Sequence, residues 1–365
     1  MALSIGIVGL PNVGKSTLFN ALNGGGAEAA NYPFCTIDPN IGLVPVPDAR
    51  LKPLIDIVKP QAVQHAVVEF VDIAGLVAGA ASGEGLGNKF LGNIRECSAI
   101  AHVVRCFDDD NVTHVHDKVN PVSDIETIDT ELMLKDIESL EKAMERQQKL
   151  SRSGGNKDAE NAMAAIKAVL TQLEDGTTVR RQQHVNSVLE IIQPLNLLTA
   201  KPVLYVANVD DGSLPDGNAY VEQVQAFAKE EGAEVAIVSA QIESELVEMD
   251  EDDKMEFLSD FGLTEPGLNT VIRTAFKLLK LATYFTAGVK EVRSWTIHEG
   301  DTAPQAAGVI HTDFEKGFIR AEVIAYDDFV NLGGEAKCKE AGKMRLEGKE
   351  YIVKDGDILH FRFNV

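Results

Sequence analysis

The chain has 365 residues, of which 45% are apolar and 25% charged, a composition that suits two or three domains with sizeable cores. A net charge of −22 argues against nucleic-acid binding by the whole surface, although a local basic patch remains compatible with it. The four cysteines lack C-x-x-C spacing and are expected to be reduced thiols. The same cysteine pattern favours a cytoplasmic protein. With no uncharged run of about 18 residues, no membrane span is expected.

The first motif is a glycine loop over residues 9–17, GLPNVGKST, which fits G-x-x-x-x-G-K-[ST]. Apolar residues 3–8 predict a buried strand before it, and residues 16–22 predict a helix after it. In this context loop N–H groups bind phosphate, Lys15 reaches the β- and γ-phosphates, and the Ser16 hydroxyl is a ligand of Mg²⁺. A plain glycine turn is the alternative, which the lysine and the serine disfavour. The expected nucleotide-binding residues are Asn12, Val13, Gly14, Lys15, Ser16 and Thr17.

Two further motifs suggest loops that sense the γ-phosphate. Thr36 lies in a loop rich in Gly, Ala, Asn and Pro, where its hydroxyl is a candidate Mg²⁺ ligand. A strand expected over 66–71 ends in the D-x-x-G motif, in which Asp72 holds Mg²⁺ and the Gly75 N–H contacts the γ-phosphate. Leu76 follows where signalling GTPases carry a water-orienting glutamine, so any hydrolytic group must come from elsewhere.

A third core strand is expected over 99–107, and the polar loop after it carries His114 and His116. Histidine titrates near pH ~6.5, which permits acid–base chemistry. Most isolated histidines have no chemical role, so both interpretations stay open for this loop.

The base-reading motifs follow two later strands, expected over 202–207 and 234–238. The first strand ends in Asn-Val-Asp-Asp, which departs from the guanine-reading N-K-x-D because valine replaces lysine. The final Asp could still accept hydrogen bonds from guanine, so GTP is not excluded. Motifs at the ends of successive strands place the site at the carboxyl edge of one parallel sheet. The expected base-binding residues are Asn208, Val209, Asp211, Ser239, Ala240 and Gln241.

Between these strands, apolar residues recur at helical spacing over 125–144, 158–173 and 179–192, which predicts a projecting helical hairpin. Its tip is basic, with one acidic residue, Glu145, against Lys142, Arg146, Lys149, Arg152 and Lys157. The tip is either an ordinary solvated end or a contact for a phosphate backbone. We expect the acidic run 243–253 to be a solvated loop or helix face.

From residue 281 the pattern changes to short alternating segments, which predict a small β-rich domain. The expected strands are 290–297, 306–310, 318–324, 351–353 and 358–363. Lysines and an arginine between 337 and 349 form a second basic cluster, which is equally consistent with an ordinary surface.

Six segments together resemble the YchF subfamily of Obg-like P-loop NTPases, over essentially the whole chain. They are GLPNVGKST (9–17), NYPFCTIDP (31–39), DIAGL (72–76), TYFTAG (283–288), HTDFEKGF (311–318) and DGDILHFRF (355–363). The resemblance implies an α/β fold in three parts. These are a P-loop NTPase core with a parallel-type sheet (1–124 and 195–280), an inserted α-helical hairpin or coiled coil (125–194), and a C-terminal β-grasp-like TGS domain (281–365).

The resemblance also implies a function: a Mg²⁺-dependent ATPase, more than a GTPase, that binds the ribosome and its large subunit. His114 is similar in position to a loop histidine proposed to act in hydrolysis, and Asn12 to the asparagine that ligates K⁺ in potassium-dependent relatives. The family's usual base motif is N-x-x-E, so Asp211 leaves the choice between ATP and GTP open.

We therefore expect a slow ATPase switch with Ser16, Thr36 and Asp72 around Mg²⁺, the basic hairpin tip and the TGS domain on the ribosome, and no membrane or sequence-specific DNA partner. A GTPase switch is one alternative, favoured by Asp211 and disfavoured by Val209. A nucleotide-gated interaction module with incidental hydrolysis is the other, and Leu76 keeps it open.

Overall fold

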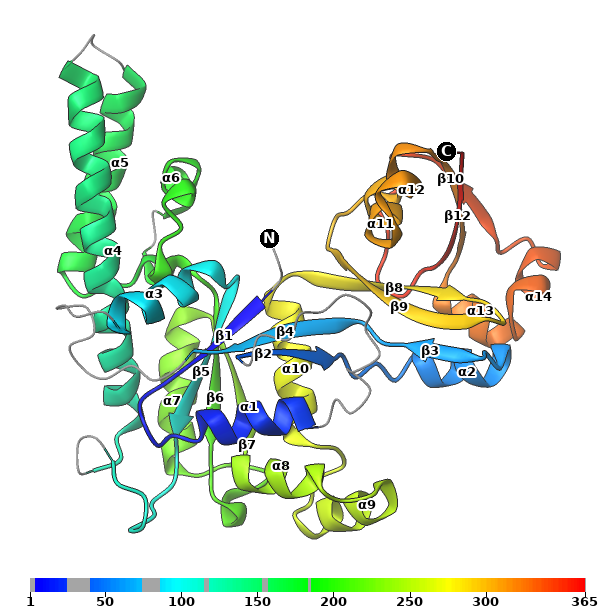
Figure 1. The fold of residues 1–365 in the computed structure, drawn as a ribbon, viewed down its shortest axis with the longest axis horizontal. Helices are drawn as coiled ribbons and strands as arrows, with labels where there is room; N and C mark the ends of the chain where they lie inside the picture. Colours follow the sequence, from blue (N-terminus) through cyan, green and yellow to red (C-terminus); the bar gives the residue numbers. More distant parts are fainter. Residues whose placement is uncertain are drawn as a thin grey trace. The chain divides into compact units, whose positions relative to one another are not determined.

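The computed structural model describes residues 4–24, 40–73, 86–114, 118–152, 157–182 and 185–364. Thr36, Gly75, Leu76 and His116 lie outside this part of the chain. The chain forms two compact units, of which unit 1 contains Met1–Leu43 and Glu69–Ala275, and unit 2 contains Val44–Val68 and Phe276–Val365. Each unit has its own six-stranded sheet (Figure 1).

Unit 1 is built on a sheet with the strand order β2-β4-β1-β5-β6-β7. Its strands are β1 (Ser4–Val8), β2 (Ile41–Pro45), β4 (Val67–Asp72), β5 (Ala99–Arg105), β6 (Val203–Asn208) and β7 (Glu234–Val238). Five of them, β4, β1, β5, β6 and β7, pair in parallel. Every residue of β1, β5 and β6 is buried, as expected for strands covered on both faces. The expected parallel core is therefore present.

The helices of unit 1 include a long pair that extends away from the sheet, α4 and α5, which lie side by side (Figure 1). The α-helices of this unit are α1 (Lys15–Gly24), α3 (Leu86–Glu96), α4 (Pro121–Arg152), α5 (Lys157–Glu174), α6 (Val185–Ile192), α7 (Ala219–Glu231), α8 (Ala240–Val247), α9 (Glu251–Asp260) and α10 (Gly267–Leu278). Short 3₁₀ turns are η3 (Val179–Arg181), η4 (Gln193–Leu195), η5 (Leu198–Ala200) and η6 (Asp211–Ser213). The helix expected over 179–192 is thus divided into η3 and α6.

Unit 2 has the strand order β11-β10-β12-β8-β9-β3. Its strands are β3 (Ala62–Gln64), β8 (Leu281–Ala287), β9 (Glu291–His298), β10 (Phe318–Ile324), β11 (Arg345–Glu347) and β12 (Ile358–Phe363). Its helices are α2 (Leu51–Val58), α11 (Ala303–Ile310), α12 (Thr312–Lys316), α13 (Tyr326–Leu332) and α14 (Glu335–Glu340). Residues 44–68, which we assigned to the NTPase core, lie in this unit and supply β3 and α2.

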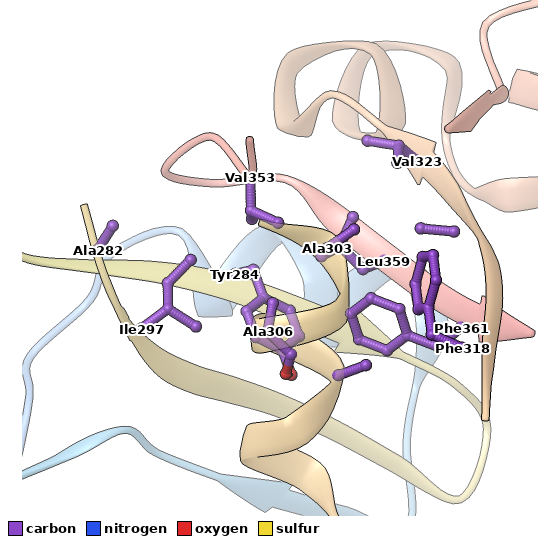
Figure 2. Packing of buried hydrophobic residues seen from close by; sticks show 12 residues of the cluster. Ala282, Tyr284, Ile297, Ala303, Ala306, Phe318, Val323, Val353, Leu359 and Phe361 are labelled. Carbon is purple, nitrogen blue, oxygen red and sulfur yellow. The ribbon is translucent and has the colours of Figure 1, made fainter. Parts of the chain in front are cut away.

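Two of the strands expected in unit 2 are wrong. Residues 306–310 belong to helix α11, because Thr302 and Gln305 form a capping box and Pro304 stands in the first turn. One face of α11 carries small residues that pack in the core of the unit against Tyr284 and Phe361 (Figure 2). The Tyr284 hydroxyl donates a hydrogen bond to the Ala306 carbonyl at 2.9 Å.

The expected strand 351–353 is a single β-bridge between Thr302 and Ile352. Strand β8, in contrast, has no counterpart among the expected strands. A short apolar run is compatible with a strand or a buried helix, and packing decides between them.

Candidate nucleotide-binding site

The glycine loop between β1 and α1 has the backbone that a phosphate-binding loop requires. Gly9, Asn12 and Gly14 have φ angles of 152°, 61° and 96°, which L side chains other than asparagine rarely adopt. A Cβ on Gly14 would stand 2.4 Å from Asn208 Nδ2, so the fold leaves space there for glycine alone. The fold thus places these glycines where a side chain would clash.

Lys15 is buried at the start of α1, and its Nζ donates to the Leu10 carbonyl at 2.6 Å. Burial lowers the pKa of Lys15, and the negative charge of Asp72 opposes this shift. The ammonium group is therefore held by the loop itself, next to a carboxylate, where phosphate oxygens could replace the carbonyl as its partner.

Asp72, at the end of β4, has a buried Oδ1 with no hydrogen-bond partner among the described residues. Burial raises the pKa of Asp72, and the positive charge of Lys15 opposes this shift. Ser16, the other candidate metal ligand in the described part of the chain, is exposed. A buried carboxylate oxygen without a hydrogen-bond partner fits Mg²⁺ or a water that Mg²⁺ binds. Within the described ranges, no three His, Cys, Asp or Glu residues form a cluster of metal ligands.

Asn208 joins three of the predicted segments. Its Nδ2 donates to the Val13 carbonyl at 2.9 Å, and its Oδ1 accepts from the Ala240 N–H at 2.9 Å. The side chain therefore fixes the glycine loop against the loop after β7. Chain order had suggested proximity of these motifs, and this residue provides the physical link between them.

Asp211, the carboxylate predicted to read the base, is oriented by a neighbour from the next strand end. The Ser239 hydroxyl donates to Asp211 Oδ1 at 2.9 Å, while the Ser239 side chain also caps α8. Val209, which stands where GTPases have lysine, is only 2% exposed. Gln241 is exposed, and its amide donates to Glu245 at 3.2 Å.

His114 is buried, and its Nε2 lies 2.9 Å from Asp124 Oδ2 in the first turn of α4. The adjacent Thr113 carbonyl accepts a hydrogen bond from Asn12 Nδ2 at 3.2 Å. The histidine loop therefore touches the glycine loop. The sequence analysis missed Asp124, because the pair joins a loop to a helix and no local pattern marks it.

Arg105 is a second residue that the sequence analysis missed. It is 2% exposed, and its guanidinium donates to the carbonyls of Phe107, Asp109 and Val112 at 3.0, 3.1 and 2.8 Å. A single charge at the end of an otherwise apolar strand was the available signal, since buried arginine needs several acceptors. Arg105 holds the first part of the histidine loop in place.

Glu243, in the acidic run expected to face solvent, is buried in α8 with 3% exposure, so that expectation is wrong for this residue. Its Oε1 accepts from the Gly267 N–H at 2.6 Å at the start of α10. Burial raises the pKa of Glu243 to about 7, although backbone hydrogen bonds oppose the shift. The pKa of the Glu243 carboxyl, one helical turn from the predicted base-binding residues 239–241, therefore lies near neutral pH.

The five basic residues of the hairpin tip, defined as Lys142, Arg146, Lys149, Arg152 and Lys157, are all exposed. Lys142 pairs with Glu138, and the side chain of Lys142 is 65% exposed. Over the described parts of the chain, no helix combines the length and apolar character needed to cross a membrane.

Two family models match the chain. MMR_HSR1, described as "50S ribosome-binding GTPase", matches residues 4–137, and YchF-GTPase_C, described as "Protein of unknown function (DUF933)", matches residues 281–364.

Relatives named "Ribosome-binding ATPase YchF" align over the full length of both chains. The protein of Pasteurella multocida is 60% identical over 365 residues, and that of Escherichia coli O157:H7 is 56% identical. The Bacillus subtilis relative is 53% identical over 367 residues. The solved structure of the Schizosaccharomyces pombe YchF GTPase is 40% identical, with a TM-score of 0.89, and the match covers 99% of this chain and 97% of that one. Full-length identity at this level, together with the geometry of the glycine loop, shows that the chain belongs to the YchF family of P-loop NTPases.

Proposed function

We propose that this chain is a Mg²⁺-dependent ATPase that hydrolyses ATP to ADP and phosphate and acts as a nucleotide-dependent switch on the ribosome. The observation that carries the proposal is the position of Lys15 and Asp72 at the glycine loop. Asn208 fixes this loop to the loop after β7. The names of the full-length relatives support ATP hydrolysis and ribosome binding.

In this proposal the loop N–H groups and Lys15 bind the β- and γ-phosphates, and Asn208, Asp211 and residues 239–241 surround the base. Bound Mg²⁺ would neutralise charge that develops on the phosphates, with Ser16, Thr36 and Asp72 as its protein ligands. Gly75 is proposed to contact the γ-phosphate through its N–H. The roles of Thr36 and Gly75 are proposed from their sequence motifs alone, since both residues lie outside the described part of the chain.

His114 is proposed to act on the attacking water, because Leu76 cannot orient it. Hydrolysis by the isolated chain is expected to be slow, as it is in switch NTPases before a partner completes the site. K⁺ is proposed as a second cofactor near Asn12, whose Nδ2 donates to Thr113, so that its Oδ1 is the atom suited to a cation.

GTP hydrolysis is the second candidate function. The hydrogen bond from Ser239 favours it, because it orients Asp211 as a base-reading carboxylate. The solved Schizosaccharomyces pombe relative is also named a GTPase. Val209 favours ATP, because a buried valine cannot cover a guanine base as the lysine of N-K-x-D does.

For the ribosome contact we propose the large subunit, reached through the exposed basic hairpin tip and the C-terminal β domain, which we propose to be a TGS domain. The tip is a concentration of positive charge in a chain of net charge −22, and the 50S description of the matching family model supports the subunit. We propose the cytoplasm as the place of action. Sequence-specific DNA binding and membrane binding are not part of the proposal.

The experiment is a titration of labelled ATP and GTP analogues with Mg²⁺, in parallel on the unmodified chain and on Lys15→Ala. We expect ATP to bind more tightly than GTP, and Lys15→Ala to lose binding of both, because the phosphates lose their one buried ammonium partner. Lys290→Ala, an exposed lysine of unit 2, is the control and should bind normally. Retained micromolar affinity in Lys15→Ala would contradict the site, and tighter GTP binding would move the chain to the GTPase class.

A further inference from the structure

Three aspartates on the first half of α4 are buried: Asp124 at 2%, Asp129 at 5% and Asp136 at 0% exposure. Asp129 is paired with Arg180 at 2.6 Å. Asp136 accepts from the N–H groups of Leu198 and Thr199 at 2.7 and 2.8 Å. Asp129 and Asp136 therefore attach α4 to the core of unit 1. Their partners compensate the cost of burying the two carboxylates.

Asp124 differs from them because its Oδ2 faces an imidazole, that of His114, at 2.9 Å. The side chains are 5% and 3% exposed, so the pair lies away from bulk water. Burying a carboxylate is costly unless it is paired. Asp136, further along the same helix, is paired with backbone N–H groups, whereas Asp124 is paired with an imidazole, a group that can also take up a proton.

The backbone that precedes His114 is held by two residues, Arg105 and Asn12. Arg105 fixes the carbonyls of Phe107, Asp109 and Val112. Asn12 of the glycine loop donates to the carbonyl of Thr113, the residue directly before His114. The segment that leads to His114 is therefore held by four hydrogen bonds, and Asp124 holds the imidazole through Nε2.

We propose that Asp124 is a positioning residue for His114 in ATP hydrolysis. It accepts the Nε2–H, and so fixes the tautomer in which Nδ1 carries the lone pair. In the reaction the water oxygen bonds to the γ-phosphorus, the bond to the β–γ bridging oxygen breaks, ADP leaves, and Nδ1 takes the proton of the water. The carboxylate then stabilises the imidazolium that forms. This inference rests on the proposed role of His114.

The test uses Asp124→Asn in single-turnover and steady-state ATP hydrolysis, with and without ribosomes. Asparagine keeps the shape but presents an amide that can select the other tautomer. We expect kcat to fall about ten-fold or more, with the dissociation constant for ATP changed less than about two-fold. Asp124→Glu should recover part of kcat, because a carboxylate is restored.

His114→Ala and the double variant complete the cycle. We expect His114→Ala to be slow and the added Asp124→Asn to cost nothing further, since Asp124 acts through the imidazole. Asp136→Asn is the matched control on the same helix, and it should lower the unfolding midpoint while kcat per folded molecule stays unchanged.

Each outcome has a distinct meaning. A normal rate in His114→Ala would overturn the proposed role of His114 and the positioning role with it. A slow His114→Ala beside a normal Asp124→Asn would overturn the positioning role alone. Additive losses in the double variant, or an equal loss of kcat in Asp136→Asn, would also overturn it, because either result makes Asp124 a structural residue.

Discussion

At the scale of single residues, burial changes the pKa of a carboxyl group in this protein. Glu243 has the same side chain as the exposed Glu245 on α8, yet burial raises the pKa of Glu243 to about 7. Because the folded-state pKa is above the ordinary value of 4.5, folding favours the protonated form. The stabilisation from this group is complete below pH ~4.5 and is lost as the pH rises through about 7.

Glu243→Gln is therefore expected to flatten the pH dependence of stability. The free energy of unfolding of the variant, relative to the unmodified chain, should rise by up to about 3 kcal/mol between pH 5 and pH 8, because glutamine does not ionise. Urea unfolding at five pH values measures this difference. Ser244→Ala, at an exposed position on α8 without a titratable group, is the control and should follow the unmodified curve. Parallel curves for Glu243→Gln would show that Glu243 does not titrate differently in the folded and unfolded states.

At the scale of elements, the attachment of the helical hairpin rests on a small buried ion-pair network. Arg180 of η3 donates to Asp129 of α4 at 2.6 Å and to Glu231 of α7 at 3.1 Å. The Tyr205 hydroxyl on β6 donates to the same Glu231 oxygen at 2.7 Å. The Arg180 guanidinium therefore joins α4 to α7, and Glu231 extends the network to Tyr205 on β6. Both carboxylates are buried, so the loss of Arg180 would leave them without a cation.

Arg180→Met is expected to destabilise unit 1 by about 3–5 kcal/mol, because Asp129 and Glu231 would stay buried without their cation. Arg273 pairs with Glu265 at the surface of unit 1, where the two side chains are 43% and 41% exposed, and Arg273→Met should cost less than about 1 kcal/mol. Chemical denaturation monitored by circular dichroism compares the two. If both variants lost an equally small amount of unfolding free energy, packing and not the ion pairs would hold the base of the hairpin.

At the scale of the whole molecule, charge is distributed unevenly. A chain of net charge −22 is repelled by RNA, yet the hairpin tip presents five exposed cations. Contact between such a tip and a phosphate backbone releases counterions and becomes weaker with added salt.

The double variant Lys149→Gln/Arg152→Gln should weaken ribosome binding and make the slope of log affinity against log salt shallower by about one to two. Co-sedimentation with ribosomes at several salt concentrations measures both quantities. Lys167→Gln, an exposed lysine further along α5, is the control and should retain the full slope. An unchanged slope in the double variant would leave the tip as an ordinary solvated end.

Much of unit 1 could be predicted from the sequence because its signals are local. The apolar runs before the glycine loop and before Asn208 correspond to β1 and β6, and β7 spans the expected residues 234–238. Parallel strands must end at the same edge of a sheet, so motifs placed after each strand meet there. The motifs also predicted the family, which the comparisons confirm.

The tertiary structure alone decided the contacts between residues far apart in the chain. β3 pairs with β9, more than 200 residues later. The bond between His114 and Asp124 and the burial of Glu243 arise in the same way, from neighbours that no local pattern specifies. The sequence by itself determined the family and the position of the glycine loop, since the spacing of residues along that one loop suffices for both, and it predicts the residues that bind phosphate. Packing determined which of the remaining side chains contact these predicted residues, because such contacts join segments far apart in the chain.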